Sequence, residues 1–255
     1  MPIEVDSICP DVLAGKKMNE IKDLPAYEGK VVHKLSDVFD ISGKVSETPA
    51  DIKIVVQKST MKLRRIGERI SAGEIEVHGD VGTHIGDSMS GGKIIVHGNA
   101  DHYAGCQMTG GELQIKGNAG DYLGSAFRGE WRGMKGGKII VDGDAGFEIA
   151  AWMRGTKKTR AKGEPFIHVK GNCGLHAGHH NHGGFLVIGG NCVGCAGSDM
   201  ARGDVIIIGK TDILASFIDS GEEAAEVESI GVKGPFTVYK GDQGIGGKGR
   251  LYIKK

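Results

Sequence analysis

Four histidines gather within the segment GLHAGHHNHGG: His176, His179, His180 and His182. Imidazole is a common ligand for zinc, and histidines two or three residues apart on a turn can converge on one ion. The segment holds neither a cysteine nor a carboxylate that would complete such a site. A solvated turn or a polar contact with a partner chain is therefore the favoured interpretation, and a metal site is the alternative.

Three of the five cysteines form a second group that could do chemistry. Cys192 and Cys195 stand in the motif CVGC, and Cys173 precedes Cys192 by the same interval that separates Gly171 from Gly190. Clustered sulfurs can bind a metal or exchange disulfides. However, residues an odd number of positions apart on a strand face opposite sides, so Cys192 and Cys195 should diverge. We expect these cysteines to be small buried residues of the stacked repeats. Their thiols should be free, because the cysteines are irregularly spaced and no signal-peptide pattern is seen.

Basic residues and one tryptophan concentrate in the segments GSAFRGEWRGMKGG and MRGTKKTRAKGEP. Tryptophan beside arginine is a combination enriched at the anchors of protein interfaces. A run of cations is also typical of an ordinary solvated loop, of a contact for the acidic face of a partner, or of a site for an anionic ligand. The candidate contact residues are Arg128, Trp131, Arg132, Arg154, Lys157, Lys158, Arg160 and Lys162.

The chain carries no motif that identifies it as an enzyme. It has no phosphate-binding loop, no paired carboxylates and no nucleophile with an obvious base. Acidic and amide residues follow the strand-like glycines, as in GDVG, GNAG and GDAG, where a side chain can bond its own turn. We therefore predict a non-catalytic chain that binds no cofactor itself.

A glycine repeat organises the elements that position these residues. Glycine makes up 44 of the 255 residues, well above its usual share. Strand-like runs such as KIIVHG end at Gly79, Gly98, Gly117, Gly143, Gly171, Gly190 and Gly209, whose numbers differ in turn by 19, 19, 26, 28, 19 and 19. A unit of 19 residues with one short strand is too small for a helical-hairpin repeat or a four-stranded propeller blade. The arrangement that fits is a parallel β-helix, in which equivalent residues stack about 4.8 Å apart.

We predict an all-β fold, a single-stranded parallel β-helix of about seven to eight coils with short α/β caps at both ends. Alternate aliphatic residues of each strand, such as Ile75 and Val77, form columns in the interior. The predicted segments are an N-terminal cap over 1–50, the β-helix over 51–210 and a C-terminal cap over 211–255. Within the caps we expect a helix in PDVLAGKKMNEIKD, a helix or helix pair over 211–230, and closing strands in FTVYKGD and RLYIKK.

The composition excludes several classes of partner. Lysine plus arginine and aspartate plus glutamate number 32 each, and this neutrality argues against a general binder of nucleic acids or membrane surfaces. No stretch of about 18 apolar residues occurs, so a membrane span is not expected. The first residues lack the basic and apolar segments of a signal peptide, which predicts a cytoplasmic protein.

The spacing GxxGxxxGxxMxGG behind strands of the type KIIVxG resembles the GXGXG-type β-helix in the C-terminal region of glutamate synthase large chains. It resembles the C subunit of formylmethanofuran dehydrogenase more closely. The segment ICPDVLAGKKMNEI is similar to the start of that protein, ISPDxxAGKxxxEI, and GNAGDYLGSAFRGEWRGMKGG is similar to its characteristic insertion. The likeness covers nearly the whole chain and implies a right-handed coil.

This family resemblance implies a scaffold subunit of a cytoplasmic archaeal complex that catalyses the first step of methanogenesis from CO2. In that family, CO2 is reduced to formate at a molybdenum or tungsten bis-pterin centre in one subunit, and formate is condensed with methanofuran at the dinuclear zinc site of an amidohydrolase-like subunit. A D subunit and ferredoxin-like subunits with iron–sulfur clusters complete the expected partners. Methanofuran has a glutamate-rich tail in the family, so the basic segment with Lys157 and Arg160 could steer it.

Other resemblances leave alternatives open. A related complex of aerobic methylotrophs, which hydrolyses formyl groups, has a similar C subunit, and the motifs do not separate the two. An acyltransferase built on a β-helix, with His180 or His182 as base, is disfavoured because its coils are made of hexapeptides, which do not divide the interval between successive strand glycines evenly. A glutamate synthase spacer would need fusion to synthase domains, which the sequence does not contain.

Overall fold

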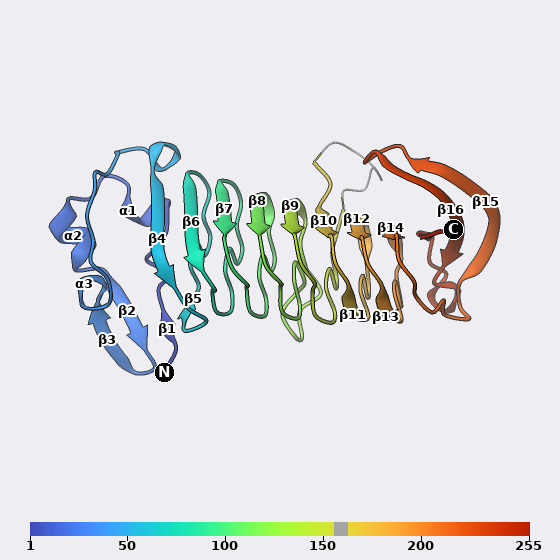
Figure 1. Cartoon of the computed structure of the whole chain (residues 1–255), viewed down its shortest axis with the longest axis horizontal. Helices are drawn as coiled ribbons and strands as arrows, with labels where there is room; N and C mark the ends of the chain where they lie inside the picture. The colour runs from blue at the N-terminus through green and yellow to red at the C-terminus, as the bar shows by residue number, and fades with distance from the viewer. Residues whose placement is uncertain (156–162) are drawn as a thin grey trace.

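The chain forms one long stack of β-strands between two end segments. The computed structural model describes residues 1–155 and 163–255. Figure 1 shows the strands side by side along the long axis, with the N-terminal helices at one end and the C-terminal hairpin at the other. The largest sheet has 11 strands in the order β15-β16-β17-β14-β12-β10-β9-β8-β7-β6-β4. Neighbouring strands from β4 to β17 run parallel.

The parallel part of this sheet is regular because each repeat of the sequence supplies one short strand. Its strands are β4 (Lys53–Ser59), β6 (Glu74–Gly79), β7 (Lys93–Val96), β8 (Thr109–Ile115), β9 (Gly136–Val141), β10 (Phe166–Val169), β12 (His182–Ile188), β14 (Arg202–Ile207) and β17 (Gly249–Lys254). Equivalent residues pair in register: Ile75 with Ile94, Ile94 with Leu113, and Leu113 with Ile139. Residues one repeat apart in the sequence are therefore neighbours in space.

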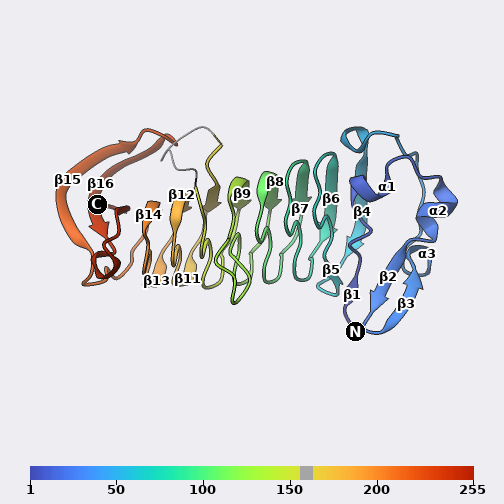
Figure 2. The ribbon, with the colours of Figure 1, turned by 180° about the vertical axis from the view of Figure 1, so that it is seen from behind.

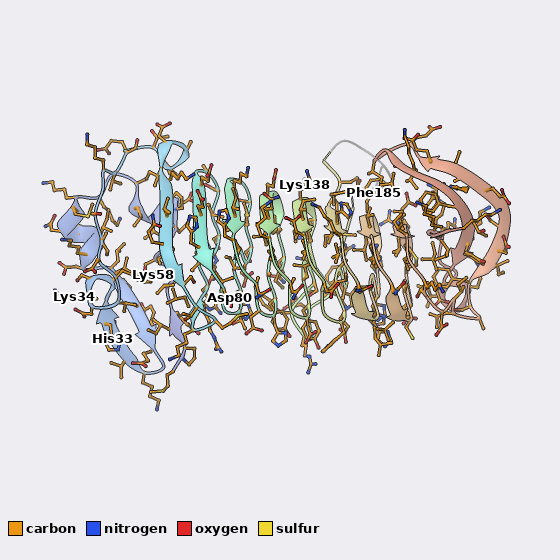
Figure 3. All side chains as sticks on the ribbon, viewed as in Figure 1. His33, Lys34, Lys58, Asp80, Lys138 and Phe185 are labelled. Carbon is orange, nitrogen blue, oxygen red and sulfur yellow. The ribbon has the colours of Figure 1, made fainter. Side chains whose placement is uncertain are left out.

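The aliphatic columns predicted from the sequence form the core. Alternate residues of a strand point to opposite faces, and Ile75, Val77, Ile139 and Val141 are all 0% exposed. Figure 3 shows other side chains along the outside of the stack, with the exposed Lys138 of β9 among them. Because burying a valine or isoleucine side chain contributes about 1.5–3 kcal/mol, repetition of these columns makes the core a large source of stability.

Glycine is required in a turn and at the start of a strand, for two different reasons. At Gly86 the backbone has a φ of +62°, a left-handed conformation that is costly for residues with a Cβ. At Gly110 the φ lies outside that region, but a Cβ would lie 2.2 Å from the carbonyl oxygen of Ser90 in the preceding repeat. The backbones of successive repeats are thus in direct contact at the start of β8.

A second, shorter line of parallel pairing runs along the stack. β11 (Cys173–Leu175) pairs with β13 (Cys192–Gly194). Figure 2 shows these two strands along the lower side of the stack, below β12 and β14. Single bridges extend the line toward the N-terminus through Val81, Ala100, Ala119 and Ala145 to Cys173. Small residues therefore occupy the same position in consecutive repeats.

The polar residues that follow the strand glycines bond the next repeat, so the prediction that they bond their own turn is wrong. The Asp80 carboxylate accepts a hydrogen bond from the N–H of Asn99 at 2.7 Å, and Asn99 Oδ1 accepts one from the N–H of Asn118 at 2.8 Å. The same contact continues through Asp144, Asn172, Asn191 and Lys210. Stacking in register explains this, because it places the N–H of the equivalent residue within reach of a short side chain.

Short helices and a small sheet form the N-terminal segment. The helices are α1 (Pro10–Leu13), α2 (Met18–Lys22), α3 (Leu35–Val38) and the 3-10 helix η1 (Pro49–Asp51), and the sheet has the order β3-β2-β1-β5 with β1 (Ile3–Glu4), β2 (Pro25–Glu28), β3 (Val31–Lys34) and β5 (Leu63–Arg64). The helix predicted in PDVLAGKKMNEIKD is thus divided into α1 and α2. The interruption falls at Gly15, whose φ of +72° is incompatible with a continuing helix.

The C-terminal segment is a β-hairpin, so the prediction of a helix over 211–230 is wrong. β15 (Ile218–Val227) pairs antiparallel with β16 (Val232–Gly241), and β16 pairs antiparallel with β17. The sequence EEAAE favours a helix locally, but β16 satisfies its backbone hydrogen bonds, and Val227 packs in a second core cluster with Phe236 and Tyr252. The closing strands in FTVYKGD and RLYIKK are confirmed. Within residues 1–155 and 163–255, no helix has the length and apolar character needed to cross a lipid bilayer.

Asp11 ties α1 to the stack through bonds that should be sensitive to acid. Its carboxylate accepts hydrogen bonds from the N–H of Ser71 at 2.9 Å and from the Ser71 hydroxyl. Partial burial raises the pKa of Asp11, but the bonds from Ser71 outweigh it and hold the pKa below its ordinary value of 3.8. The stabilisation is therefore fully present above the ordinary value and is lost as the pH falls through the folded-state pKa.

We expect acid to loosen the N-terminal segment before it affects the stack. Hydrogen exchange of residues 10–22, corrected for intrinsic rates, should accelerate below about pH 4 in the natural protein. Asp11→Asn should remove most of this dependence and exchange faster at neutral pH. An Asp11→Asn variant with the same pH profile as the natural protein would contradict the assignment.

Candidate functional site

The basic segments GSAFRGEWRGMKGG and MRGTKKTRAKGEP lie in the two longer intervals of the repeat, of 26 and 28 residues, and are called the first and second interrupting segments. They contact each other at Trp131. The guanidinium carbons of Arg132 and Arg154 lie 4.4 Å and 4.8 Å from the centroid of the Trp131 ring. The N–H of Arg154 donates to the carbonyl oxygen of Met134 at 2.8 Å, which holds the start of the second segment against the first. Trp131, Arg132 and Arg154 are called the Trp131 cluster below.

The Trp131 cluster combines exposed apolar surface with two positive charges. Trp131 is 48% exposed, so about half of a large aromatic side chain is free to contact a partner. A cation over an aromatic face contributes about 0.5–1 kcal/mol at an exposed site, and two such contacts hold the ring in place before any partner binds. A pre-ordered aromatic ring flanked by arginines is typical of interface anchors.

Arg128 lies on a different aromatic ring, that of Tyr122. Its Nε donates to the Tyr122 hydroxyl at 3.1 Å, and its guanidinium carbon lies 5.3 Å from the centroid of that ring. The other predicted contact residues, Lys157, Lys158, Arg160 and Lys162, lie outside the described residues. Among the described candidates, the structure therefore brings Trp131, Arg132 and Arg154 together and places Arg128 on Tyr122.

A stack of aromatic rings that is not among the residues predicted from the sequence lies beside the first of these segments. His84 stacks on Tyr103 with centroids 5.1 Å apart, and Tyr103 stacks on Tyr122 at 4.7 Å. The interplanar angles are 2° and 7°. Each of the three residues stands five positions after the glycine that ends the strand of its repeat. An aromatic residue at this same position in three consecutive repeats is the sequence signal that indicates the stack.

Phe127 joins the first interrupting segment to this aromatic stack. Its ring centroid lies 5.5 Å from that of His84 and 5.8 Å from that of Tyr103, with both pairs tilted. Aromatic pairs at such distances contribute about 0.5–1.5 kcal/mol beyond their buried area. The segment is thus held at Phe127 by the aromatic stack and at Trp131 by the arginines, so its exposed face is a defined surface.

The structure brings part of the predicted histidine group together with a carboxylate. His176 and His179 direct Nδ1 at the Ser198 hydroxyl, at 3.2 Å and 2.8 Å. One ligand atom each from His179, His180 and Asp199 lie within 4.8 Å of one another. The carboxylate that GLHAGHHNHGG lacks thus comes from the next repeat. Two imidazoles and a carboxylate can share hydrogen bonds or hold a metal.

His180 and His182 border the ring of Trp152. His180 stacks on it with centroids 4.0 Å apart, and His182 lies 5.9 Å away. Burial lowers the pKa of His180, and burial together with the positive charge of Arg154 lowers the pKa of His182. Both rings are therefore neutral at neutral pH, and they offer stacking surface and hydrogen bonds rather than charge.

Cys173 and Cys192 lie directly above each other, as their spacing predicts. They pair in register between β11 and β13, and each is 3% exposed. They continue the line of bridged positions that holds Ala100 and Ala119 in earlier repeats, so they act as small buried residues. The hydrogen bond with Cys192, together with burial, raises the pKa of Cys173. Cys195 is partly exposed, which agrees with the expected divergence from Cys192.

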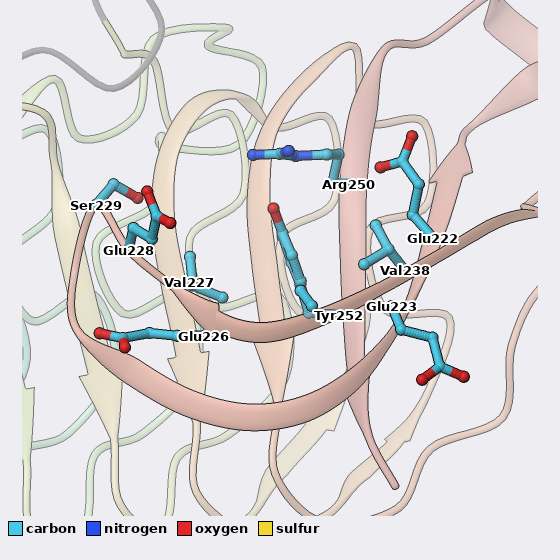
Figure 4. Close-up of a pocket in the computed structure, with 10 residues that line it drawn as sticks. Glu222, Glu223, Glu226, Val227, Glu228, Ser229, Val238, Arg250 and Tyr252 are labelled. Atoms are coloured by element: carbon cyan, nitrogen blue, oxygen red, sulfur yellow. The ribbon is translucent and has the colours of Figure 1, made fainter.

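A hollow of about 510 Å³ lies beneath the β15–β16 hairpin. Figure 4 shows its main charged and aromatic lining: Glu222, Glu223, Glu226, Glu228, Arg250 and Tyr252. The Nε of Arg250 lies 3.1 Å from Oδ1 of the buried Asp204, and Lys240 and Lys255 form ion pairs with Glu222 and Glu223. The hollow is not predicted from the sequence, because a helix rather than a hairpin is expected over 211–230.

Comparison with known proteins decides the family. No protein-family model matches the chain. The C subunit of the tungsten-containing formylmethanofuran dehydrogenase 2 of Methanococcus maripaludis is 38% identical over 261 residues, covering 99% of this chain and 92% of that relative. The chain belongs to the family of formylmethanofuran dehydrogenase C subunits. The resemblance carried by GxxGxxxGxxMxGG is therefore confirmed.

Other members of this C-subunit family match over a shorter segment. The C subunit of the tungsten-containing formylmethanofuran dehydrogenase 2 of Methanothermobacter wolfeii is 42% identical over 85 residues, which cover 33% of this chain and 32% of the relative. The C subunit of the molybdenum-containing formylmethanofuran dehydrogenase 1 of Methanosarcina barkeri is 37% identical over 83 residues, or 32% of this chain and 28% of the relative. The chain thus aligns with about a third of the length of these relatives.

A solved structure supports the fold of this member of the C-subunit family. The crystal structure of the formyltransferase/hydrolase complex FhcABCD from Methylorubrum extorquens in complex with methylofuran contains a chain that matches with a TM-score of 0.75. The match covers 100% of this chain and 96% of that one, at 24% identity. At this identity, the likeness shows a shared fold.

The fold of this C subunit should leave one thiol much more reactive than the other four. Burial raises the pKa of Cys9 to about 11 and also raises the pKa of Cys106. The hydrogen bond with Cys173 lowers the pKa of Cys192 to about 7, but Cys173 and Cys192 are both enclosed, so reagent cannot reach them. Because the thiolate is the nucleophile, we expect iodoacetamide at about pH 8 to label Cys195 at least about tenfold faster than the others. Peptide mass mapping over time measures this. Fast labelling at Cys192 would contradict its enclosure.

Proposed function

We propose that this chain is the structural C subunit of a cytoplasmic, archaeal formylmethanofuran dehydrogenase complex and performs no chemistry itself. In the complex, CO2 is reduced to formate at a molybdenum or tungsten pterin centre of one partner, and formate is condensed with methanofuran at a dinuclear zinc site of an amidohydrolase-like partner. A D subunit and ferredoxin-like subunits with iron–sulfur clusters are the other partners. The observation that carries the proposal is the match to the M. maripaludis relative over 99% of the chain.

The proposal gives the stack of strands a mechanical role. In this proposal, residues 51–210 form a right-handed β-helix of about seven to eight coils, and residues 1–50 and 211–255 form its caps. In-register parallel pairing from β4 to β17 and the buried aliphatic columns support it. Because each inner strand is hydrogen-bonded on both sides, the rod resists bending and holds catalytic partners at a fixed separation.

The Trp131 cluster is the proposed anchor for a partner in the complex. Its aromatic ring already contacts two guanidinium groups, so little conformational entropy is lost when a partner covers it. The two positive charges favour an acidic partner surface. The basic residues Lys157 and Arg160, which follow Arg154 in the sequence, would attract the anionic tail of methanofuran.

Affinity purification of the chain from its native cell, with mass spectrometry of co-eluting chains and analysis of metals, tests this function. We expect the pterin-metal and zinc subunits to co-elute, together with molybdenum or tungsten, iron and zinc. Recovery of the chain alone would overturn the proposal. Turnover of a small acyl donor by the isolated chain would overturn its non-catalytic role.

A second candidate is the C subunit of a formyltransferase/hydrolase complex. The fold shared with a chain of the M. extorquens complex favours it. The same purification separates the two candidates, because a hydrolase complex is expected to contain no pterin-metal subunit, no molybdenum or tungsten and no ferredoxin-like chains.

A further inference from the structure

Glu76, His78 and His97 converge on the outer face of the large sheet. Glu76 and His78 lie two residues apart on β6 and so face the same side. His97 directly follows β7 and occupies the position equivalent to His78 in the next repeat. The two imidazole rings stack with centroids 4.5 Å apart and an interplanar angle of 5°. The repeat therefore places the two rings side by side.

Both rings direct the same atom at the same carboxylate oxygen. His97 Nε2 lies 2.9 Å from Glu76 Oε1, and His78 Nε2 lies 3.2 Å from it. All three groups offer ligand atoms within 4.8 Å of one another. In a tetrahedral zinc site, bonds of about 2.0–2.1 Å place neighbouring ligand atoms about 3.3 Å apart. For the three atoms to bind one ion, the two imidazole rings must rotate out of their parallel stack so that both Nε2 lone pairs point at it.

Lys53 holds the Glu76 carboxylate without using that oxygen. Its Nζ lies 2.7 Å from Glu76 Oε2 and 2.8 Å from Glu74 Oε1. The hydrogen bonds from Lys53 and His97 lower the pKa of Glu76. Glu76 is thus an ionised carboxylate, with Oε2 held by the lysine and Oε1 turned toward the two imidazoles.

Later repeats carry ordinary ion pairs at the position of His78 and His97, directly before the strand glycine. Lys116 and Lys170 flank Asp142, with Nζ to carboxylate oxygen distances of 3.2 Å and 2.7 Å. Alternating charges satisfy one another there. At His78 and His97, two nitrogen ligands instead follow each other and share one carboxylate, which is the arrangement that a cation can complete.

We propose that Glu76, His78 and His97 form a binding site for a divalent transition-metal ion of the zinc type. The imidazoles bind through Nε2 as Nδ1–H tautomers, the carboxylate binds through Oε1, and the fourth position is left for water or a partner's side chain. Because the ligands come from two adjacent repeats, a bound ion joins them and stabilises this end of the stack by mass action.

Zinc titration of the full chain, purified without a histidine tag, tests the site by isothermal calorimetry. Glu76→Gln, His78→Gln and His97→Gln should each weaken zinc binding by at least about tenfold. Lys53→Gln should tighten binding by about threefold, because it removes a neighbouring positive charge. Circular dichroism with EDTA present verifies that each variant is folded. Wild-type protein that binds no zinc, or variants that bind it with unchanged affinity, would overturn the proposal.

His179 and His180 provide the matched control, because with Asp199 they form another group of neighbouring ligand atoms. The double change His179→Gln with His180→Gln should leave intact the binding that His97→Gln removes. Cobalt substitution gives a second readout: tetrahedral visible bands should appear in the wild-type protein and the control variant, and be absent in His97→Gln. Bands or affinity lost only in the control variant would place the site elsewhere and overturn the assignment.

Discussion

Gly110→Ala is expected to reduce the free energy of unfolding by about 3 kcal/mol. A Cβ at this position would lie 2.2 Å from the carbonyl oxygen of Ser90 and 3.0 Å from its carbonyl carbon. Both contacts are with backbone, which cannot rotate away as a side chain can. Relief therefore requires β8 to separate from the preceding repeat. Denaturant unfolding followed by circular dichroism measures the loss.

Gly244→Ala is the matched control for this change. Gly244 also lacks a positive φ, and its Cβ would meet only the side-chain oxygen Oδ1 of Asp242, at 3.2 Å. The Asp242 carboxylate accepts hydrogen bonds from the N–H groups of Gly244 and Asp199, but a shift of only a few tenths of an ångström relieves this contact. We therefore expect the free energy of unfolding to change by no more than about 1 kcal/mol. Equal losses at Gly110 and Gly244 would contradict the view that backbone contact between repeats requires glycine.

Trp131→Ala is expected to weaken assembly with the partner subunits while the chain stays folded. Anchors of this kind cost about 2 kcal/mol or more when truncated, which is about thirtyfold in the dissociation constant. Because the ring is 48% exposed, the free energy of unfolding should change by no more than about 1 kcal/mol. Binding of the purified chain to the remaining subunits, measured by interferometry, gives the first quantity, and denaturant unfolding gives the second.

Ile245→Ala is the control for loss of exposed apolar surface. Ile245 is 51% exposed and lies in the C-terminal 3-10 helix η2 (Gln243–Ile245), away from the interrupting segments. It should leave assembly unchanged. If Trp131→Ala binds the partners as tightly as Ile245→Ala does, the Trp131 cluster is not an anchor.

The repeat made most of the parallel stack predictable. Strand glycines at a regular spacing marked which residues are equivalent, and period-two alternation marked which of them face inward. Ile94 between Ile75 and Leu113, and Cys192 beside Cys173, are therefore where the spacing predicts. The physical reason is that hydrogen bonding between neighbouring repeats leaves one register in which the inward-facing aliphatic side chains are all buried.

The incorrect predictions concern segments whose local conformational preference differs from the contacts that they make with distant parts of the chain. The segment EEAAE has the residues of a helix, but pairing with β16 and packing against Phe236 make it a strand. Asp80 has the residue type of a self-bonded turn, but the N–H of Asn99 in the next repeat is its partner. In both cases a partner supplied by the fold outweighs the preference of the segment alone.

The candidate sites also combine features that the sequence determines with features that only the tertiary structure decides. Sequence alone determined the length of the repeat, the inward columns and the family likeness, because each is carried by residue type at a constant spacing. Only the tertiary structure decided that Arg154 lies on Trp131 and that one carboxylate oxygen of Glu76 contacts both His78 and His97. Those contacts depend on how loops of irregular length fold back and on which way exposed side chains turn, and neither is constrained by burial of a hydrophobic pattern.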